Sequence, residues 1–211
     1  MTHHPTILVY GDTLKYIFPL ILIIGREPNN VLPVRDTVEE YDFDTARHCA
    51  FWNFSHGFVA RIVNKRHTAR DFKQLCRSKK ASPIAYADSL PICIPNETVG
   101  KQIARSSVSD ADINRHIDNI FRHRQIINRT ALVLLSGLRD PVFERSVRRI
   151  REMSHHCLDV PFFGSTEHKM KNMISDLPCD AQLLLKKLYL QFKKWRPRAV
   201  SSQRGLFRLK A

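Results

Sequence analysis

Two carboxylates follow apolar segments of the kind that form buried strands. Glu27 comes shortly after the apolar run at residues 20–24, and Asp88 ends a second apolar segment at residues 83–88. Leu and Ile in an unbroken run are typical of a parallel strand covered on both faces, and loops at the carboxyl ends of such strands bind ligands. The sequence therefore predicts a site at this edge of a sheet, where a carboxylate could orient water or stabilise positive charge.

Both acids also have a structural interpretation. Glu27 could be a solvated loop acid beside an arginine, and Asp88 could cap the turn that follows it. Three neighbouring residues, His155, His156 and Cys157, could suggest a metal. Because adjacent residues rarely bind one ion together, we expect no metal site there.

Apolar and amphipathic segments alternate along the chain, which indicates alternating strands and helices. The apolar segments predict four strands, at residues 20–24, 83–88, 131–135 and 158–163. A long loop over residues 25–43 is expected to line a cleft. Helices are expected from residue 44 to about 63, over 69–77, from 109 onwards, over 141–151 and over 183–195.

The starts of three helices have capping signals. Thr68, Ser109 and Asp140 each precede a helical segment, and Pro141 suits a first helical position. Strands joined through helices make right-handed crossovers in a mainly parallel sheet. The predicted fold is therefore α/β, a three-layer α/β/α sandwich with a central, mainly parallel four-stranded sheet in which residues 20–24 and 131–135 are adjacent strands.

The length and composition suit one domain. The 211 residues, 43% of them hydrophobic, can bury a single core, so we expect one α/β domain over residues 1–195 and a basic tail over 196–211. The longest apolar run, residues 16–24, is about half as long as a bilayer requires. The N-terminus lacks the pattern of a signal peptide. We expect a soluble intracellular protein with no membrane partner.

The chain is strongly basic, with a formal net charge of +14. Residues 181–211 hold nine Lys or Arg and no acid, and a second basic stretch at residues 61–80 is interrupted only by Asp71. A surface this basic attracts polyanions, nucleic acid first among them. Alternatively, the basic faces could keep the protein soluble and the tail could be a disordered arm.

Five short stretches follow one another in an informative order. They are GREPN at 25–29, AFWN at 50–53, IAYADSL at 84–90, VLLSG at 133–137 and FFGSTEH at 162–168. This order resembles the uracil-DNA glycosylase superfamily, particularly its mismatch-specific uracil/thymine DNA glycosylase branch. That family has a G-x-N-P-G or G-x-D-P loop after an apolar strand, then R-F-W, G-x-T-[ND], L-x-x-x-G and an N-P-S or H-P-S turn. The resemblance spans about residues 20–177 and depends on the order of the motifs.

The resemblance implies a DNA glycosylase-like hydrolase that flips out a deaminated or mismatched, uracil-type base and hydrolyses its N-glycosidic bond in base excision repair. Glu27 would be the catalytic carboxylate beneath the sugar carbon, where positive charge develops. Contacts to the base or substrate would come from Gly25, Arg26, Pro28, Asn29, Phe51 and Asp88. DNA contacts would come from Gly164, Ser165, Thr166, His168 and Lys169.

Some of these positions have another interpretation, and some depart from the family. Phe51 could anchor its helix in the core, and a loop aromatic such as Tyr41 or Phe43 could instead stack on a base. His168 could be a surface histidine at a helix start. Relatives carry Asn or Asp where Glu27 stands, and Glu167 adds a negative charge to the closing turn. The alternative function is a catalytically silent nucleic-acid-binding protein on the same fold, and a third is a hydrolase of small nucleotides or nucleosides.

We expect no cofactor. The five cysteines are odd in number and widely spaced, and they do not match the four placed cysteines of cluster-bearing branches of the superfamily. Neither a disulfide framework, a zinc knuckle nor an iron–sulfur cluster is indicated. The expected partner is DNA, single- or double-stranded, damaged or mismatched. The expected state is a monomer, located in the cytoplasm with the nucleoid or in a nucleus.

Overall fold

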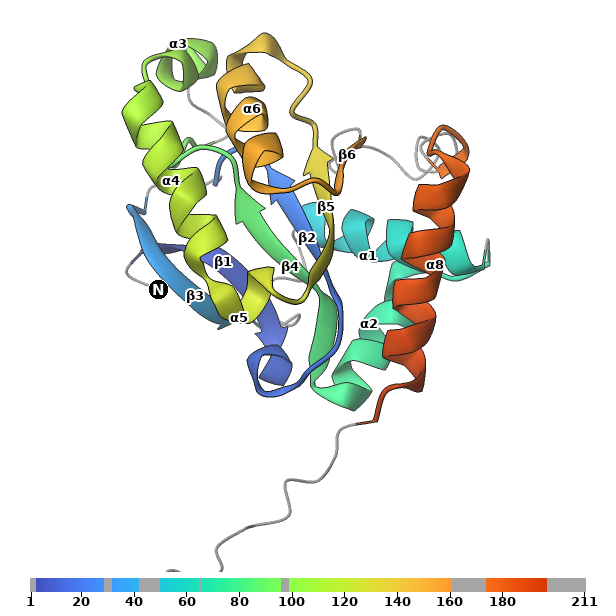
Figure 1. The fold of residues 1–211 in the computed structure, drawn as a ribbon. Helices are drawn as coiled ribbons and strands as arrows, with labels where there is room; N and C mark the ends of the chain where they lie inside the picture. The colour runs from blue at the N-terminus through green and yellow to red at the C-terminus, as the bar shows by residue number, and fades with distance from the viewer. Residues whose placement is uncertain are drawn as a thin grey trace, which may run out of the picture.

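One six-stranded sheet forms the centre of the fold (Figure 1). The computed structural model describes residues 3–28, 32–41, 50–64, 66–95, 99–160 and 174–196, with the backbone alone for 50–54. The strands lie in the order β3-β1-β4-β2-β5-β6. Their bounds are β1 His4–Gly11, β2 Leu20–Gly25, β3 Val34–Tyr41, β4 Ala81–Asp88, β5 Thr130–Ser136 and β6 Cys157–Val160.

The four predicted strands form a continuous parallel block, β4-β2-β5-β6. β2 lies between β4 and β5, and every residue of β2 is buried, because its unbroken Leu and Ile side chains are covered on both faces. The predicted adjacency of residues 20–24 and 131–135 is confirmed, since Leu22 pairs with Val133. This block brings the ends of β2 and β4 to the same edge.

The predicted number of strands is wrong, because the sheet has two further strands, β1 and β3, at its β4 side. β1 runs antiparallel to β4, and β3 runs parallel to β1. The predicted loop over residues 25–43 therefore contains a strand. β3 is an edge strand whose exposed residues include Arg35, Asp36 and Glu40, so it lacks the apolar pattern of a buried strand. β1 lies between β3 and β4 and carries Pro5 beside a shift in its pairing register with β3, and such irregularities tolerate proline.

The helices lie in two groups (Figure 1). In the figure, α4 and α6 lie on one side of the sheet, and α1, α2 and α8 lie on the other. The helix bounds are α1 Ala50–Val63, α2 Ala69–Lys79, α3 Lys101–Ser106, α4 Asp110–Arg122, α5 Arg124–Ile127, α6 Glu144–Met153 and α8 Cys179–Lys194, with 3-10 turns at Asp12–Lys15 and Pro141–Phe143. Within the described helices, none is long and apolar enough to cross a membrane.

The predicted helix starts are confirmed at three positions. Thr68 and Asp71 form a reciprocal capping box at the start of α2, and the Ser109 side chain accepts a hydrogen bond from the backbone N–H of Asp112 at the start of α4. Asp140 accepts from the backbone N–H of Val142. Short polar side chains at these positions satisfy backbone donors that lack a partner inside the helix.

Other predicted boundaries shift or lie outside the described residues. The last helix begins at Cys179, one turn before the predicted start. β6 is described to Val160, so the remainder of the strand predicted at 158–163 lies outside the described residues. The same holds for the turn at 164–169, for the helix start predicted at residue 44, and for residues 197–211 of the predicted tail.

Candidate site at the carboxyl edge of the sheet

The loop after β2 and the end of β4 lie side by side. Gly25, the last residue of β2, pairs with Asp88, the last residue of β4. The backbone N–H of Ser89 donates to the Gly25 carbonyl at 3.0 Å and to the Arg26 carbonyl at 2.9 Å, and the Ser89 hydroxyl donates to the Arg26 carbonyl at 2.7 Å. The backbone N–H of Ile94 donates to the Pro28 carbonyl in this loop at 2.9 Å. The structure therefore brings together the predicted residues Gly25, Arg26, Glu27, Pro28 and Asp88.

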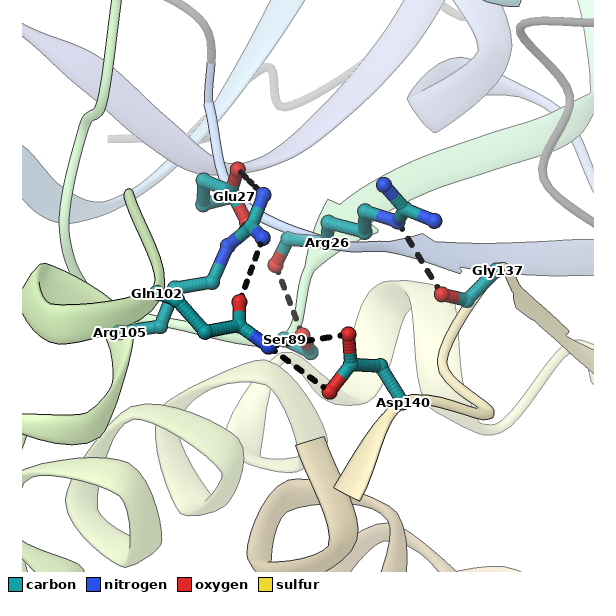
Figure 2. Close-up of polar contacts among 7 residues, drawn as sticks. All are labelled: Arg26, Glu27, Ser89, Gln102, Arg105, Gly137 and Asp140. Carbon is teal, nitrogen blue, oxygen red and sulfur yellow. Dashed lines mark hydrogen bonds and ion pairs between the residues drawn. The ribbon is translucent and has the colours of Figure 1, made fainter. Parts of the chain in front are cut away.

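Glu27 is held by an arginine from a distant part of the chain (Figure 2). Nε of Arg105 donates to Oε2 of Glu27 at 3.0 Å, and Nη2 donates to Oε1 at 2.5 Å. The side chains of Glu27 and Arg105 are 6% and 11% exposed. The Arg105 guanidinium also lies 5.3 Å from the ring centroid of Phe143. A planar, two-point pair of this kind fixes the orientation of the carboxylate.

The same arginine connects the β2 loop with the β5–α6 connection (Figure 2). Nη1 of Arg105 donates to Oε1 of Gln102 at 3.2 Å, and Nε2 of Gln102 donates to both carboxylate oxygens of Asp140 at 3.1 Å. The Val142 N–H first, and then the Gln102 amide, lower the pKa of Asp140 below its usual value. Nε of Arg26 donates to the Gly137 carbonyl at 3.1 Å. The edge is therefore a connected polar network.

Asp88 is in contact with two histidines. Nε2 of His4 lies 3.0 Å from Oδ2 of Asp88, and Nε2 of His116 lies 2.8 Å from its backbone carbonyl oxygen. Burial lowers the pKa of His116 below its usual value, while the hydrogen bond to Asp88 opposes that shift. His4 reaches this edge because β1 runs antiparallel to β4.

A polar cavity of about 460 Å³ lies beside this edge, between the starts of β1 and β3, the segment after β4, and α4. Its lining includes Thr6, Arg35, Asp36, Pro91, His116 and Asn119. The volume falls in the range of small-molecule sites. Glu27 is not among the described residues that line it, so the cavity touches the Asp88 side of the edge, through His116.

A second polar cluster lies under the edge and is sealed from solvent. The Ser55 hydroxyl lies 2.6 Å from the Tyr86 hydroxyl, which lies 3.2 Å from Nδ1 of His56. Ser55 and His56 have no exposed surface, and Tyr86 is 3% exposed. Burial also raises the pKa of the neighbouring Tyr41 well above its usual value. Because substrate cannot reach these groups, we interpret them as a buried hydrogen-bonded part of the core.

The remaining predicted site residues are not tested by the structure. Phe51 lies in the first turn of α1, and its side chain lies outside the described residues. Asn29 and the predicted DNA contacts Gly164, Ser165, Thr166, His168 and Lys169 also lie outside the described residues. In the described parts of the chain, no group of three or more His, Cys, Asp or Glu side chains is placed to hold a metal ion.

Sequence reasoning missed Arg105, His4 and His116. His116 follows Ile113 by one helical turn on the buried face of α4. The apolar pattern of that helix is therefore a signal that could have placed its side chain inward. His4 could be placed only once β1 was known. Arg105 lies in a six-residue helix far along the chain from Glu27, and nothing in its local sequence marks it as a partner.

No protein-family model matches this chain, and no match is found among curated proteins. The family resemblance therefore stays a hypothesis that depends on the order of the short motifs.

Proposed function

We propose that this protein is a DNA glycosylase-like hydrolase that excises a deaminated or mismatched base at the carboxyl edge of β2 and β4. One observation carries the proposal. The loop Gly25–Pro28 and Asp88, which are distant in sequence, emerge from adjacent parallel strands at one edge. Ligands bind at this edge in open α/β sheets.

The proposed chemistry needs water as its only co-reactant. The bond between the sugar C1′ and the base nitrogen breaks, its electron pair leaves with the base, and the water oxygen bonds to C1′ while the water gives up a proton to solvent or base. Positive charge on the sugar is stabilised by a carboxylate beneath it. Glu27 takes this role in the proposal, and Asp88 accepts a hydrogen bond from the edge of the base.

Arg105 is compatible with this role as a positioning residue. A carboxylate has about four acceptor positions, and Arg105 uses one on each oxygen of Glu27. A water molecule can therefore occupy a remaining position while the carboxylate plane stays fixed. Fixed groups of this kind lower the cost of reaching a reactive geometry.

The test is base release from oligonucleotides that contain uracil, hypoxanthine, xanthine or mismatched thymine, single- and double-stranded, followed by alkaline cleavage of abasic sites. We expect strand breaks on at least one substrate, and their loss in Glu27→Gln. The matched control is Glu40→Gln, because Glu40 is an exposed acid at the far end of β3. Breaks that persist in Glu27→Gln would contradict the assigned role.

A second candidate is a catalytically silent nucleic-acid-binding protein on the same fold. One observation favours it, namely that the Glu27 side chain is 6% exposed with a hydrogen bond to each oxygen. In that case, Glu27 and Arg105 are a structural pair. Salt-sensitive binding of oligonucleotides with no base released from any of the four substrates would select this candidate.

A further inference from the structure

We propose that a second surface, formed by α2 and α8, binds the phosphate backbone of nucleic acid. This surface, called here the α2–α8 face, is defined by its exposed cations. They are Arg66, Arg70, Arg77, Lys80, Lys186, Lys187, Lys193, Lys194 and Arg196. The inference does not depend on base excision, since it concerns a surface away from the carboxyl edge.

α2 and α8 touch each other through aromatic side chains, and both pack against α1. The Phe72 ring of α2 lies 5.1 Å from the Tyr189 ring and 6.4 Å from the Phe192 ring of α8, measured between centroids. Nζ of Lys79 donates to the Trp195 carbonyl and lies 5.6 Å from the Phe192 centroid. Phe72 and Phe192 are buried. The two helices therefore form one packed unit, and their cations are exposed on its outer surface.

The fold supplies little negative charge to this surface. In residues 66–80 and 179–196 the acids are Asp71 and Asp180. The Asp71 carboxylate accepts hydrogen bonds from the N–H and hydroxyl of Thr68 in the capping box, and Asp180 lies in the first turn of α8, at the opposite end from Lys193 and Lys194. On the opposite side of the sheet, three of the four arginines of α6 are paired with acids: Arg145 with Asp110, Arg149 with Asp118 and Arg151 with Asp159. The α2–α8 face therefore has a larger excess of cations over acids than α6 has.

The α2–α8 face extends to the end of the molecule opposite the candidate site (Figure 1). α2 ends at Lys79, just before β4 begins at Ala81. The end of α8 lies beside the end of α2, since Lys79 contacts Trp195. β4 has eight residues, so its first and last residues are about 23 Å apart. In Figure 1, β4 runs upward to the candidate site, while α2 and α8 end at the bottom.

Nucleic acid fits this face better than an anionic membrane does. Lys186 and Lys193, like Lys187 and Lys194, are two helical turns apart, about 10 Å along the axis, which corresponds to about three base-pair steps. Helices that bind in a membrane interface present a large apolar face toward the lipid. On the described part of α2 and α8, Leu183 is the one large apolar side chain that is exposed.

The test compares two triple variants of the full chain with the same charge change. Lys187→Glu, Lys193→Glu and Lys194→Glu alter the α2–α8 face, whereas Arg122→Glu, Arg124→Glu and Arg148→Glu alter exposed cations of α4, α5 and α6. The probes are a labelled 20-nucleotide single strand and the matching duplex, titrated between 50 and 200 mM salt. If the α2–α8 variant fails to fold, as judged by circular dichroism, the corresponding Lys→Gln triple replaces it.

We expect the α2–α8 variant to bind at least about tenfold more weakly and to lose about two to three units of the slope of log K against log salt, because each neutralised phosphate contributes about 0.9. The control variant should change affinity less than about threefold. Equal weakening in both variants would overturn the proposal, since overall charge would then explain binding. Unchanged binding in the α2–α8 variant, or binding to phosphatidylserine vesicles without oligonucleotide binding, would also overturn it. None of these outcomes depends on whether a base is released, so this inference can fail while the proposed function stands, or the reverse.

Discussion

The carboxyl edge and the α2–α8 face use charge in opposite ways. At the edge, the charged side chains are bound to neighbours: Glu27 to Arg105, Asp88 to His4 and Asp140 to Gln102. On the α2–α8 face, nine exposed cations share two stretches, residues 66–80 and 179–196, that contain two acids. Paired groups hold one geometry, whereas a concentration of like charge attracts a distant polyanion. The excess positive charge and the candidate site are therefore located in different parts of this molecule.

Removal of Arg105 should have the largest effect on the carboxyl edge. Arg105→Ala leaves the Glu27 carboxylate buried without its partner, so we expect the free energy of unfolding to fall by about 3–5 kcal/mol. Urea unfolding of Arg105→Ala and of the exposed control Arg122→Ala measures this. The control should change by less than about 0.5 kcal/mol. A loss below about 1 kcal/mol in Arg105→Ala would show that the edge does not depend on the pair.

Lys79 tests the packing of the α2–α8 face. Lys79→Met keeps the aliphatic stem between Phe192 and Trp195 but removes the donor to the Trp195 carbonyl. We expect a loss of about 1–3 kcal/mol, as for a charged hydrogen bond in a partly buried place. The exposed neighbour Lys80→Met is the control. Equal effects of the two substitutions on unfolding would argue against a specific role for Lys79.

Thr68 tests the start of α2 alone. Thr68→Ala removes the hydroxyl that accepts from the Asp71 N–H, whereas the Thr68 backbone N–H can still donate to the Asp71 carboxylate, and we expect a loss of about 1 kcal/mol. Thr68→Ser should restore most of the stability because Ser caps equally well. Thermal unfolding of the three proteins measures the order. If the Ser variant is as unstable as the Ala variant, the capping interpretation is wrong.

The smallest expected effect is the pH dependence contributed by His116. Burial lowers the pKa of His116, so the unfolded chain binds this proton at a higher pH than the folded chain does. Neutral His116 therefore contributes its full stability above about pH 6.5, and this contribution decreases as the pH falls toward the lowered pKa. Asp88, Asp36 and His4 supply the other charges that act on it.

The measurement for His116 is urea unfolding of wild type and His116→Gln from pH 7.5 to pH 5. The stability of wild type relative to the variant should decrease as the pH falls through this range. A difference in stability that stays constant with pH would mean that the pKa of His116 is the same in the folded and unfolded states.

The sequence predicted those parts of the fold that have a local cause. The buried strands β2 and β5 follow from unbroken apolar runs, and the caps at Thr68, Ser109 and Asp140 follow from short polar side chains before helices. β3 was missed because an edge strand that carries charged residues has no apolar period to detect.

The candidate site was predicted only in part for a similar reason. Gly25, Glu27 and Asp88 could be placed at one edge because each ends, or closely follows, a detectable strand. The partner of each acid could not be predicted. Arg105 and His4 reach Glu27 and Asp88 through tertiary contacts between distant segments, and a single sequence contains no local signal for such contacts.

The most direct test measures base release and binding together on the most reactive of the four substrates, with protein in excess over DNA. We predict that Glu27→Gln lowers the single-turnover rate about 100-fold or more and leaves Kd unchanged. We also predict that Lys187→Glu, Lys193→Glu and Lys194→Glu together raise Kd and leave the rate at saturating protein unchanged. If one variant impairs both quantities equally, the division of chemistry and binding between the carboxyl edge and the α2–α8 face is contradicted. If wild type releases no base from any substrate, the assignment of chemistry to the carboxyl edge is contradicted.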